Sequence, residues 1–286
     1  MKLSAHEISE AVKSALREDV GRGDATTLAL VPAKAQARAR LVAREPLVVA
    51  GLDFAAAAFK TISAAVRLER EARDGDKLRA GQTLLSVAGP ARALLTGERT
   101  ALNFVQRLSG IATLTARYVQ AVAGTGAHIL DTRKTTPGWR RFSKCAVLCG
   151  GGRNHRLGLY DMVLIKDNHL VALRGEQPNP IAAAVQRARL AWPRLKVEVE
   201  ADTLEQARQA AEAGADFILL DNMSPATLRK AVALVRGRAL TEASGGVTLK
   251  TVRAIAETGV DFISVGALTH SAPAVDIALD FEAADA

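Results

Sequence analysis

Residues 197–222 read VEVEADTLEQARQAAEAGADFILLDN, and this stretch contains one complete strand–helix–strand unit. Val197-Glu198-Val199 and Phe217-Ile218-Leu219-Leu220 are short apolar runs of the length of buried strands. Between them, Asp202 and Glu205 predict a capping box at the start of a helix. Strand, helix and strand in this order indicate a parallel sheet with crossover helices.

The same unit recurs along the chain from residue 128 onward. Asn179-Pro180 and Ser224-Pro225 each place an N-cap before a proline at the first helical position. The apolar runs that we interpret as strands number about six: His128-Ile129-Leu130, Met162-Val163-Leu164-Ile165, Val197-Glu198-Val199, Phe217-Ile218-Leu219-Leu220, Ala239-Leu240-Thr241 and Phe262-Ile263-Ser264-Val265. The predicted fold is therefore an incomplete, TIM-like parallel α/β barrel with fewer than eight strands.

The first part of the chain follows a different pattern. Ser4 and Glu7 predict a capping box, and residues 36–95 are mostly strand-like segments separated by turn signals. Near the C-terminus, Val275, Ile277, Leu279 and Phe281 alternate with polar or small residues, as in a half-exposed strand. We predict an α+β sandwich domain over residues 1–112, the barrel over 113–272, and packing of 273–286 back onto the first domain.

The chain of 286 residues has a formal net charge of +8, and most of that excess lies in one segment. Residues 131–174 contain nine Lys and Arg against three Asp, a net charge of +6. Such a concentration favours an anionic partner over a generally basic surface. Two cysteines, no apolar N-terminal run and no long apolar window predict a soluble, cytoplasmic protein without a membrane partner. For Cys145 and Cys149 we favour a structural role over zinc binding.

Residues with chemical potential follow the predicted strands, at the edge where a parallel barrel carries its active site. Arg133, Lys134, His155, Arg156 and Lys166 lie at or beside the first two strand ends and together indicate a multiply charged anion. A basic surface loop is the alternative, although Lys166 directly follows an apolar strand, which is a poor place for an idle charge.

Two acids and two glycine loops follow the later strands. Glu200 and Asp221 could face ribose hydroxyls or hydrated Mg²⁺, or they could simply be solvated or salt-bridged acids, and spacing leaves both readings open. Ser244-Gly245-Gly246 and Val265-Gly266-Ala267 favour phosphate binding as a pair, although either loop alone indicates only a tight turn.

These segments resemble the quinolinate phosphoribosyltransferase family over essentially the whole chain, in order. The motifs that carry the resemblance are Glu18 to Asp24, Gly97 to Asn103, Asp131-Thr132-Arg133-Lys134-Thr135-Thr136-Pro137-Gly138, Gly150 to Arg156, Leu164 to His169, Leu220-Asp221-Asn222, Ala243 to Gly246 and Val265 to His270. Trp139 and Cys145 depart from the family pattern, at positions that flank the cationic loop.

The resemblance implies a pentosyltransferase, a glycosyltransferase of NAD biosynthesis. Its family reaction joins quinolinate to phosphoribosyl pyrophosphate, with loss of CO₂ and pyrophosphate, giving nicotinate mononucleotide. It also implies a Mg²⁺ cofactor carried by the substrate near Glu200 and Asp221, without direct protein ligands, and a homodimer in which Arg99 enters the neighbouring active site.

The site residues carried over from the family fall into two groups. Catalytic roles are expected for Lys134, Lys166, Glu200 and Asp221. Substrate binding is expected for Arg99, Thr132, Arg133, Lys134, His155, Arg156, Lys166, Glu200, Asp221, Ser244, Gly245, Gly246, Ser264, Val265, Gly266 and Ala267.

Two alternatives remain at this point. A related protein associated with molybdenum uptake shares the fold and part of the signature, but the runs Asn154-His155-Arg156 and Ile165 to His169 favour the quinolinate enzyme. A nucleic-acid-binding module needs cations spread over a face, often with stacking aromatics, whereas aromatic residues are only 4% of this chain. We therefore expect no nucleic-acid partner.

Overall fold

The computed structural model describes residues 1–282, which form two compact units. The first unit comprises residues 1–116, 141–151 and the C-terminal segment from 271, and the second comprises 117–140 and 152–270. The helix that contains residues 141–149 thus groups with the first unit, whereas the sequence boundaries placed it in the barrel. Its apolar face explains the difference, because Phe142 packs edge-on against Phe54 of the first unit at 5.0 Å between ring centroids.

An antiparallel sheet forms the centre of the first unit. Its strands are β1 (Gln36–Ala43), β3 (Arg67–Arg70), β5 (Thr83–Pro90) and β12 (Ile277–Phe281), in the order β12-β1-β5-β3. A separate pair joins β2 (Leu47–Val48) to β4 (Lys77–Leu78). The C-terminal strand β12 pairs antiparallel with β1, with Ala43 opposite Ile277 and Ala39 opposite Phe281. The chain therefore returns to its first sheet at its end.

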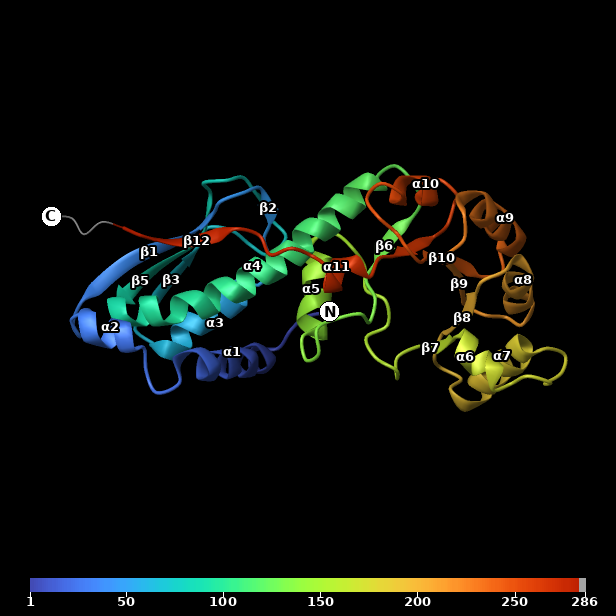
Figure 1. Ribbon diagram of the computed structural model, residues 1–286, viewed down its shortest axis with the longest axis horizontal. Helices are drawn as coiled ribbons and strands as arrows, with labels where there is room; N and C mark the ends of the chain where they lie inside the picture. The colour runs from blue at the N-terminus through green and yellow to red at the C-terminus, as the bar shows by residue number, and fades with distance from the viewer. Residues whose placement is uncertain (283–286) are drawn as a thin grey trace. The chain divides into compact units, whose positions relative to one another are not determined.

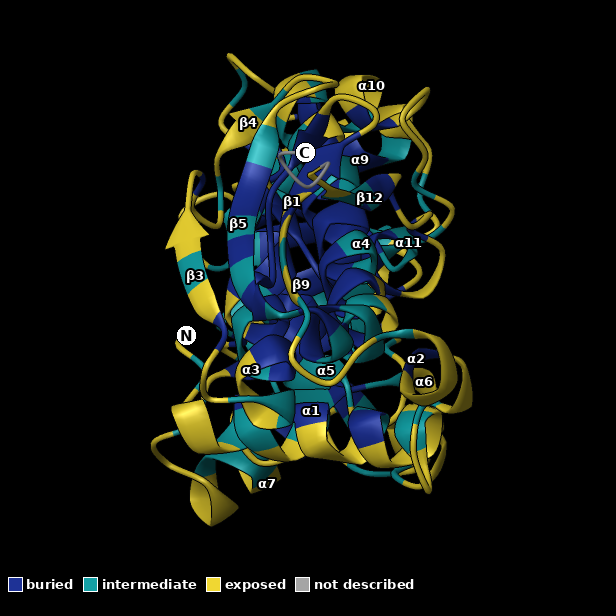
Figure 2. Cartoon of the chain, turned by 90° about the vertical axis from the view of Figure 1, so that its left-hand side faces the viewer, coloured by how far each residue is buried: buried dark blue, intermediate teal, exposed yellow. Residues whose placement is uncertain are grey.

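Helices complete the first unit. They are α1 (Ala5–Val20), α2 (Ala25–Leu30), α3 (Leu52–Ile62), α5 (Arg140–Cys149) and α4 (Ala91–Ala121), which runs past the boundary between the units. α1 begins at the predicted capping box, since Ser4 accepts from the backbone of Glu7 and the Glu7 side chain reaches back to Ser4. Figure 2 shows the buried interior of the chain in dark blue, with β3 exposed over most of its length.

Few aromatic rings are available for this core, and three of them form one cluster. Phe54 stacks on Phe104 with ring centroids 4.8 Å apart, and Phe142 meets Phe54 edge-on. α4 also approaches the segment that leads to β12 at Gly110. A Cβ atom at Gly110 would lie 1.9 Å from the carbonyl oxygen of Pro273, so only glycine allows this approach.

A six-stranded parallel sheet forms the second unit, as the strand–helix alternation predicts. Its strands are β6 (His128–Leu130), β7 (Val163–Ile165), β8 (Val197–Ala201), β9 (Phe217–Asp221), β10 (Leu240–Ser244) and β11 (Phe262–Ser264). The order β6-β11-β10-β9-β8-β7 leaves β6 and β7 as the two edges, which makes the barrel incomplete. At one edge, Leu130 of β6 makes a parallel bridge with Arg153.

The helices between these strands are α6 (Asp167–Val171), α7 (Pro180–Ala191), α8 (Leu204–Glu212), α9 (Pro225–Val235), α10 (Val252–Ala256) and α11 (Ala267–His270). Asn179 and Ser224 cap α7 and α9 as predicted. The predicted box at α8 was wrong by one residue: Thr203 is the N-cap and Gln206 its partner, because the Thr203 hydroxyl accepts from the Gln206 backbone. Among residues 1–282, we find no helix with the length and apolar character that crossing a membrane requires.

Candidate active site

A cavity of about 570 Å³ lies within the second unit, where the parallel strands end. The residues that line it come from all six strands of the sheet or from the segments that follow them. They are Thr132, Arg133, Lys134, His155, Arg156, Leu164, Lys166, Glu200, Leu219, Asp221, Asn222, Glu242, Ser244, Gly245, Gly246 and Ser264. The size suits small-molecule substrates, and the lining combines a few apolar side chains with many polar ones.

Two arginines on one side of the cavity have buried donors without a partner. The Nε atoms of Arg133 and Arg156 are buried and make no hydrogen bond to any described residue. Burial, and after it the charge of Arg133, lowers the pKa of Arg156. Two guanidinium groups kept close, with donors unused, form a site for an anion that can accept from both.

Buried Asp131 fixes the segment that carries Arg156. One of its carboxylate oxygens accepts from the Asn154 side chain at 2.7 Å, and the other accepts from the His155 backbone N–H at 2.9 Å. The Arg156 guanidinium also donates to the carbonyl of Met162 at 3.1 Å. Asp131 itself does not line the cavity, so its part is to hold the residues that do.

Two carboxylates face the cavity from neighbouring strands. Glu200 near the end of β8 forms an ion pair with Lys166, the residue that follows β7. Asp221 at the end of β9 accepts from the Asn222 side chain at 2.6 Å. This ion pair brings the carboxylate and the ammonium group together, as expected for residues at the ends of neighbouring parallel strands.

The loop after β10, from Ser244 to Gly246, has no charged side chain and lines the cavity with main-chain groups. Gly245 and Gly246 have φ angles of +92° and +58°, and the backbone N–H of Asn222 donates to the Ser244 carbonyl at 2.9 Å. A Cβ atom at Gly245 would lie 2.1 Å from Asn222 Oδ1, so this loop and the Asp221-Asn222 turn require glycine at that position. The loop thus leaves open backbone where a phosphate could approach.

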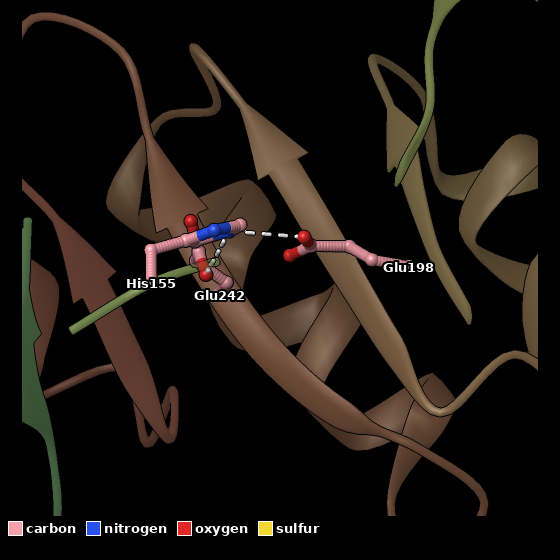
Figure 3. A group of neighbouring side chains, drawn as sticks. All are labelled: His155, Glu198 and Glu242. Atoms are coloured by element: carbon pink, nitrogen blue, oxygen red, sulfur yellow. Dashed lines mark ion pairs between the residues drawn. The ribbon is translucent and has the colours of Figure 1, made fainter. Parts of the chain in front are cut away.

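His155, which lines the cavity, also faces two buried carboxylates. Its Nε2 lies 3.0 Å from Glu198 Oε2 and 3.5 Å from Glu242 Oε2, and Figure 3 draws both ion pairs from the same ring nitrogen. The side chains of Glu198 and Glu242 are 1% and 2% exposed. Burial, followed by the charge of Glu198, raises the pKa of Glu242 to about 8.

Most of the expected site residues meet at this cavity. Of the residues singled out from the sequence, twelve line it: Thr132, Arg133, Lys134, His155, Arg156, Lys166, Glu200, Asp221, Ser244, Gly245, Gly246 and Ser264. Val265, Gly266 and Ala267 do not belong to the lining; the first two connect β11 to the short helix α11, which begins at Ala267. Gly266 instead lies against Lys134: a Cβ there would be 3.2 Å from the Lys134 side chain. Arg99 is an exposed residue of α4, outside the lining of this chain's cavity.

Sequence reasoning missed Glu242 and the buried Glu198. The apolar run that marks the fifth strand covers Ala239 to Thr241, and β10 continues from it to Ser244 with Glu242 inside it. The available signal was the two-residue period, since Glu242 shares a face with Ser244, and Glu198 shares one with Glu200. Asn222, Leu164 and Leu219 also line the cavity without having been assigned a role.

The cysteines have no part in this cavity. Cys145 and Cys149 are free thiols on α5 in the first unit. Burial raises the pKa of both, and that of Cys149 reaches about 12. Both are therefore protonated at neutral pH, in agreement with the structural role that the sequence favoured.

Comparisons with known proteins give the same result along the whole chain. The family model for the quinolinate phosphoribosyl transferase N-terminal domain matches residues 24–109, and the model for its C-terminal domain matches residues 111–280. Nicotinate-nucleotide pyrophosphorylase [carboxylating] of Mycobacterium leprae is 45% identical over 277 residues, with 95% of this chain and 96% of the relative covered. A protein of Bacillus subtilis named as probable nicotinate-nucleotide pyrophosphorylase [carboxylating] is 43% identical, with 92% and 89% covered.

Solved structures agree with these sequence matches. NadC from Streptococcus pyogenes superimposes with a TM-score of 0.94 at 40% identity, with all of both chains covered. Nicotinate-nucleotide pyrophosphorylase from Francisella tularensis gives a TM-score of 0.92 at 38% identity, with 98% of each chain covered. By its two domain matches, its relatives and its fold, this chain belongs to the quinolinate phosphoribosyltransferase family.

Proposed function

We propose that the cavity at the strand ends of the second unit is the active site of a nicotinate-nucleotide pyrophosphorylase (carboxylating). The reaction transfers phosphoribosyl from phosphoribosyl pyrophosphate to quinolinate and gives nicotinate mononucleotide, pyrophosphate and CO₂. The observation that carries the assignment is the pair Arg133 and Arg156, whose buried Nε donors lack a partner in a cavity that also holds Lys134 and Lys166. A dicarboxylate supplies the acceptors that these donors lack.

The other side of the cavity suits the phosphoribosyl group. Glu200 and Asp221 line the cavity, and we propose that the ribose ring binds beside them, because a carboxylate stabilises the positive charge that develops on the ring as pyrophosphate leaves. The open backbone of the loop from Ser244 to Gly246 is the binding site that we propose for a phosphate. Of the segment after β11, Gly266 lies beside the Lys134 side chain, since a Cβ atom there would be 3.2 Å from it.

The chemistry then follows from charge. The ring nitrogen of quinolinate attacks C1 of the ribose, and the bond to pyrophosphate breaks with its electron pair. The ring nitrogen becomes positive. When the carboxylate on the adjacent carbon leaves as CO₂, its electron pair stays on that carbon, and the neighbouring positive charge stabilises it. That carbon then takes up a proton, and Lys134 and Lys166 are the nearby ammonium donors in the lining.

Mg²⁺ fits the donor set of this cavity. Glu200 and Asp221 offer carboxylate oxygens at one end, which is the chemistry that a hydrated Mg²⁺ on a pyrophosphate prefers. We propose that both acids face the ion through its water molecules, without binding it directly. When bound, the ion neutralises charge on the leaving pyrophosphate.

The decisive assay mixes the purified protein with quinolinate, phosphoribosyl pyrophosphate and Mg²⁺ and follows nicotinate mononucleotide and CO₂. Turnover that needs all three components supports the proposal, and removal of Mg²⁺ with a chelator should abolish it. Turnover with nicotinate or another base, but none with quinolinate, would refute the assignment.

We further propose that the enzyme is a cytoplasmic homodimer in which Arg99 serves the neighbouring active site. The support is that Arg99 is exposed on α4 and that its side chain comes no nearer than 4.0 Å to the carboxylate of Glu98. Mixing Arg99→Ala subunits with Lys166→Ala subunits should restore part of the activity, because one of the two sites in a mixed dimer is whole. Mixed preparations as inactive as either variant alone would contradict a shared site.

A further inference from the structure

The cluster of His155, Glu198 and Glu242 lies in the barrel interior and has no part in the chemistry described above. His155 and Glu242 line the cavity, and Glu198 lies behind them on β8. The ligand atoms of the three side chains lie within 4.8 Å of one another. Two carboxylates so close in a buried place must be compensated, because both cannot remain ionised without a partner.

The imidazole of His155 does not provide that compensation as a cation. The backbone N–H of Arg156 donates to His155 Nδ1 at 2.7 Å. A ring nitrogen that accepts a hydrogen bond carries no proton, so His155 is neutral and its one proton is on Nε2. Nε2 is the ring atom nearest to both carboxylates, at 3.0 Å from Glu198 Oε2 and 3.5 Å from Glu242 Oε2, although it makes no hydrogen bond to Glu198 Oε2.

Because His155 is neutral, the negative charge of the two carboxylates must be reduced in another way, by a proton on one of the carboxyl groups. Both carboxylate oxygens of Glu198 and Oε1 of Glu242 are buried and have no hydrogen-bond partner among residues 1–282. A proton on one carboxyl group that is hydrogen-bonded to the other supplies what both lack. The remaining groups that act on Glu242 are His155 and the hydroxyl of Ser264 on β11, and the charge of Arg156 acts on the cluster through Glu198.

We propose that Glu198 and Glu242 share one proton below a neutral His155, and that this proton makes Glu242 a specificity determinant for the dicarboxylate substrate. The proposal rests on the proposed function. Glu242 lines the cavity in which quinolinate brings two negative charges, so an ionised Glu242 would repel the substrate and a protonated one does not. With the proton shared, the pair of carboxyl groups carries one negative charge instead of two, so it competes less with quinolinate for Arg133 and Arg156.

The expected pH dependence has a definite sign. The pKa of Glu242 is raised, so the carboxyl group is neutral below about pH 8 and ionises as the pH rises through that value. Quinolinate is a dianion on both sides of this transition. If only the protonated cluster binds it, the affinity falls by up to about tenfold per pH unit above the transition.

The first experiment measures kcat/KM for quinolinate from acid to alkaline pH, because this ratio reports ionisations of the free enzyme. Wild type should lose activity on the alkaline side, mainly through KM. Glu242→Gln cannot ionise at this position, so its kcat/KM should stay level through the pH range where wild type falls. Glu69→Gln, an exposed change on β3, is the matched control and should follow wild type. Identical profiles for wild type and Glu242→Gln would refute the proposal.

The second experiment needs no substrate and reads the protonation state on the wild-type protein, with one variant used only to assign a signal. Nitrogen-15 NMR of histidine-labelled protein, with His155 assigned by its loss in His155→Gln, should show a neutral ring protonated on Nε2 at neutral pH. An imidazolium with both nitrogens protonated would overturn the shared proton. A transition-metal ion bound one per chain in wild type and lost in Glu242→Gln would overturn it as well.

The two experiments separate this inference from the proposed function. If quinolinate is not turned over at any pH, the proposed function fails and the NMR spectrum still decides where the proton lies. If quinolinate is turned over but the alkaline fall is unchanged in Glu242→Gln, the function stands and Glu242 is not a specificity determinant.

Discussion

Replacing Gly245 by alanine tests whether the loop after β10 is shaped for phosphoribosyl pyrophosphate. The new Cβ atom would lie 2.1 Å from Asn222 Oδ1 and 2.5 Å from Asn222 Cγ, so the Asn222 side chain must move. Asn222 is itself held at φ +52° and donates to the Asp221 carboxylate at 2.6 Å. Moving it breaks that hydrogen bond and releases the acid that we place near the ribose.

The neighbouring Gly246 offers a matched control. It also has a positive φ, +58°, but a Cβ atom there meets nothing within 4 Å. Both alanine variants therefore carry the cost of a left-handed backbone, about 1–2 kcal/mol. Only Gly245→Ala adds the loss of a hydrogen bond to a charged acceptor, about 1.5–3 kcal/mol. If the whole difference is felt in the transition state, it lowers kcat/KM by roughly 10- to 160-fold.

Steady-state kinetics with each substrate varied in turn distinguishes the two variants. Gly245→Ala should lower kcat/KM for phosphoribosyl pyrophosphate far more than Gly246→Ala does, with a smaller effect on the KM for quinolinate. Thermal unfolding should show the shared backbone cost in both variants and a further loss in Gly245→Ala, from the displaced Asn222 side chain and its broken hydrogen bond. Equal kcat/KM values for phosphoribosyl pyrophosphate in the two variants would refute the argument that Asn222 couples the loop to Asp221.

Three further changes test other contacts. Arg133→Ala should abolish quinolinate binding while the fold persists, as circular dichroism and a binding titration would show; near-normal affinity would contradict the proposed pocket. Asp131→Asn should lower the free energy of unfolding by about 1–3 kcal/mol in a denaturant titration, because an amide cannot accept from both Asn154 and the His155 N–H. Gly110→Ala should lower the free energy of unfolding by about 1–3 kcal/mol through overpacking against Pro273. Gly126→Ala is the control, because a Cβ atom there meets nothing within 4 Å, and an equal loss of stability in that variant would contradict the prediction.

The barrel and most of its site could be predicted because parallel strands have directional ends. Apolar runs marked the strands, and the polar residues that follow them had to gather at one edge. Lys166 and Glu200 illustrate this, since they are 34 positions apart and form an ion pair only because β7 and β8 are parallel neighbours. Nothing in their local sequence contains that contact beyond the register of the two strands.

Buried charge could not be predicted from the same rules. Strand recognition relies on apolar runs, and the run from Ala239 to Thr241 stops before Glu242, a residue of a type that is rarely buried. The exception depends on His155, which is 87 positions away and enters the barrel on a segment that bridges to β6 through Arg153. The contact between Glu242 and His155 depends on the tertiary structure, and the sequence of the strand does not indicate it.

The charge excess of residues 131–174 proved to be only partly a substrate site. Arg133, Lys134, Arg156 and Lys166 line the cavity. Arg141 instead pairs with Glu7 in the first unit, where Lys144 is also buried. The net charge along the sequence therefore identified the right segment, although fewer than half of its Lys and Arg residues line the cavity.

What distinguishes the cavity is the distribution of its charges over the sheet rather than their sum, with the ion pair of Lys166 and Glu200 where the cationic and acidic parts meet. Its lining has four Lys and Arg and three Asp and Glu, so it is nearly balanced. The cations follow or adjoin the edge strands β6 and β7, and the acids belong to the central strands β8, β9 and β10. A substrate whose negative carboxylates must lie beside a carbon that becomes positive needs both halves of such a site at once. An incomplete barrel provides them, because its two edges bring cations together from opposite ends of the sheet while the acids remain in the middle.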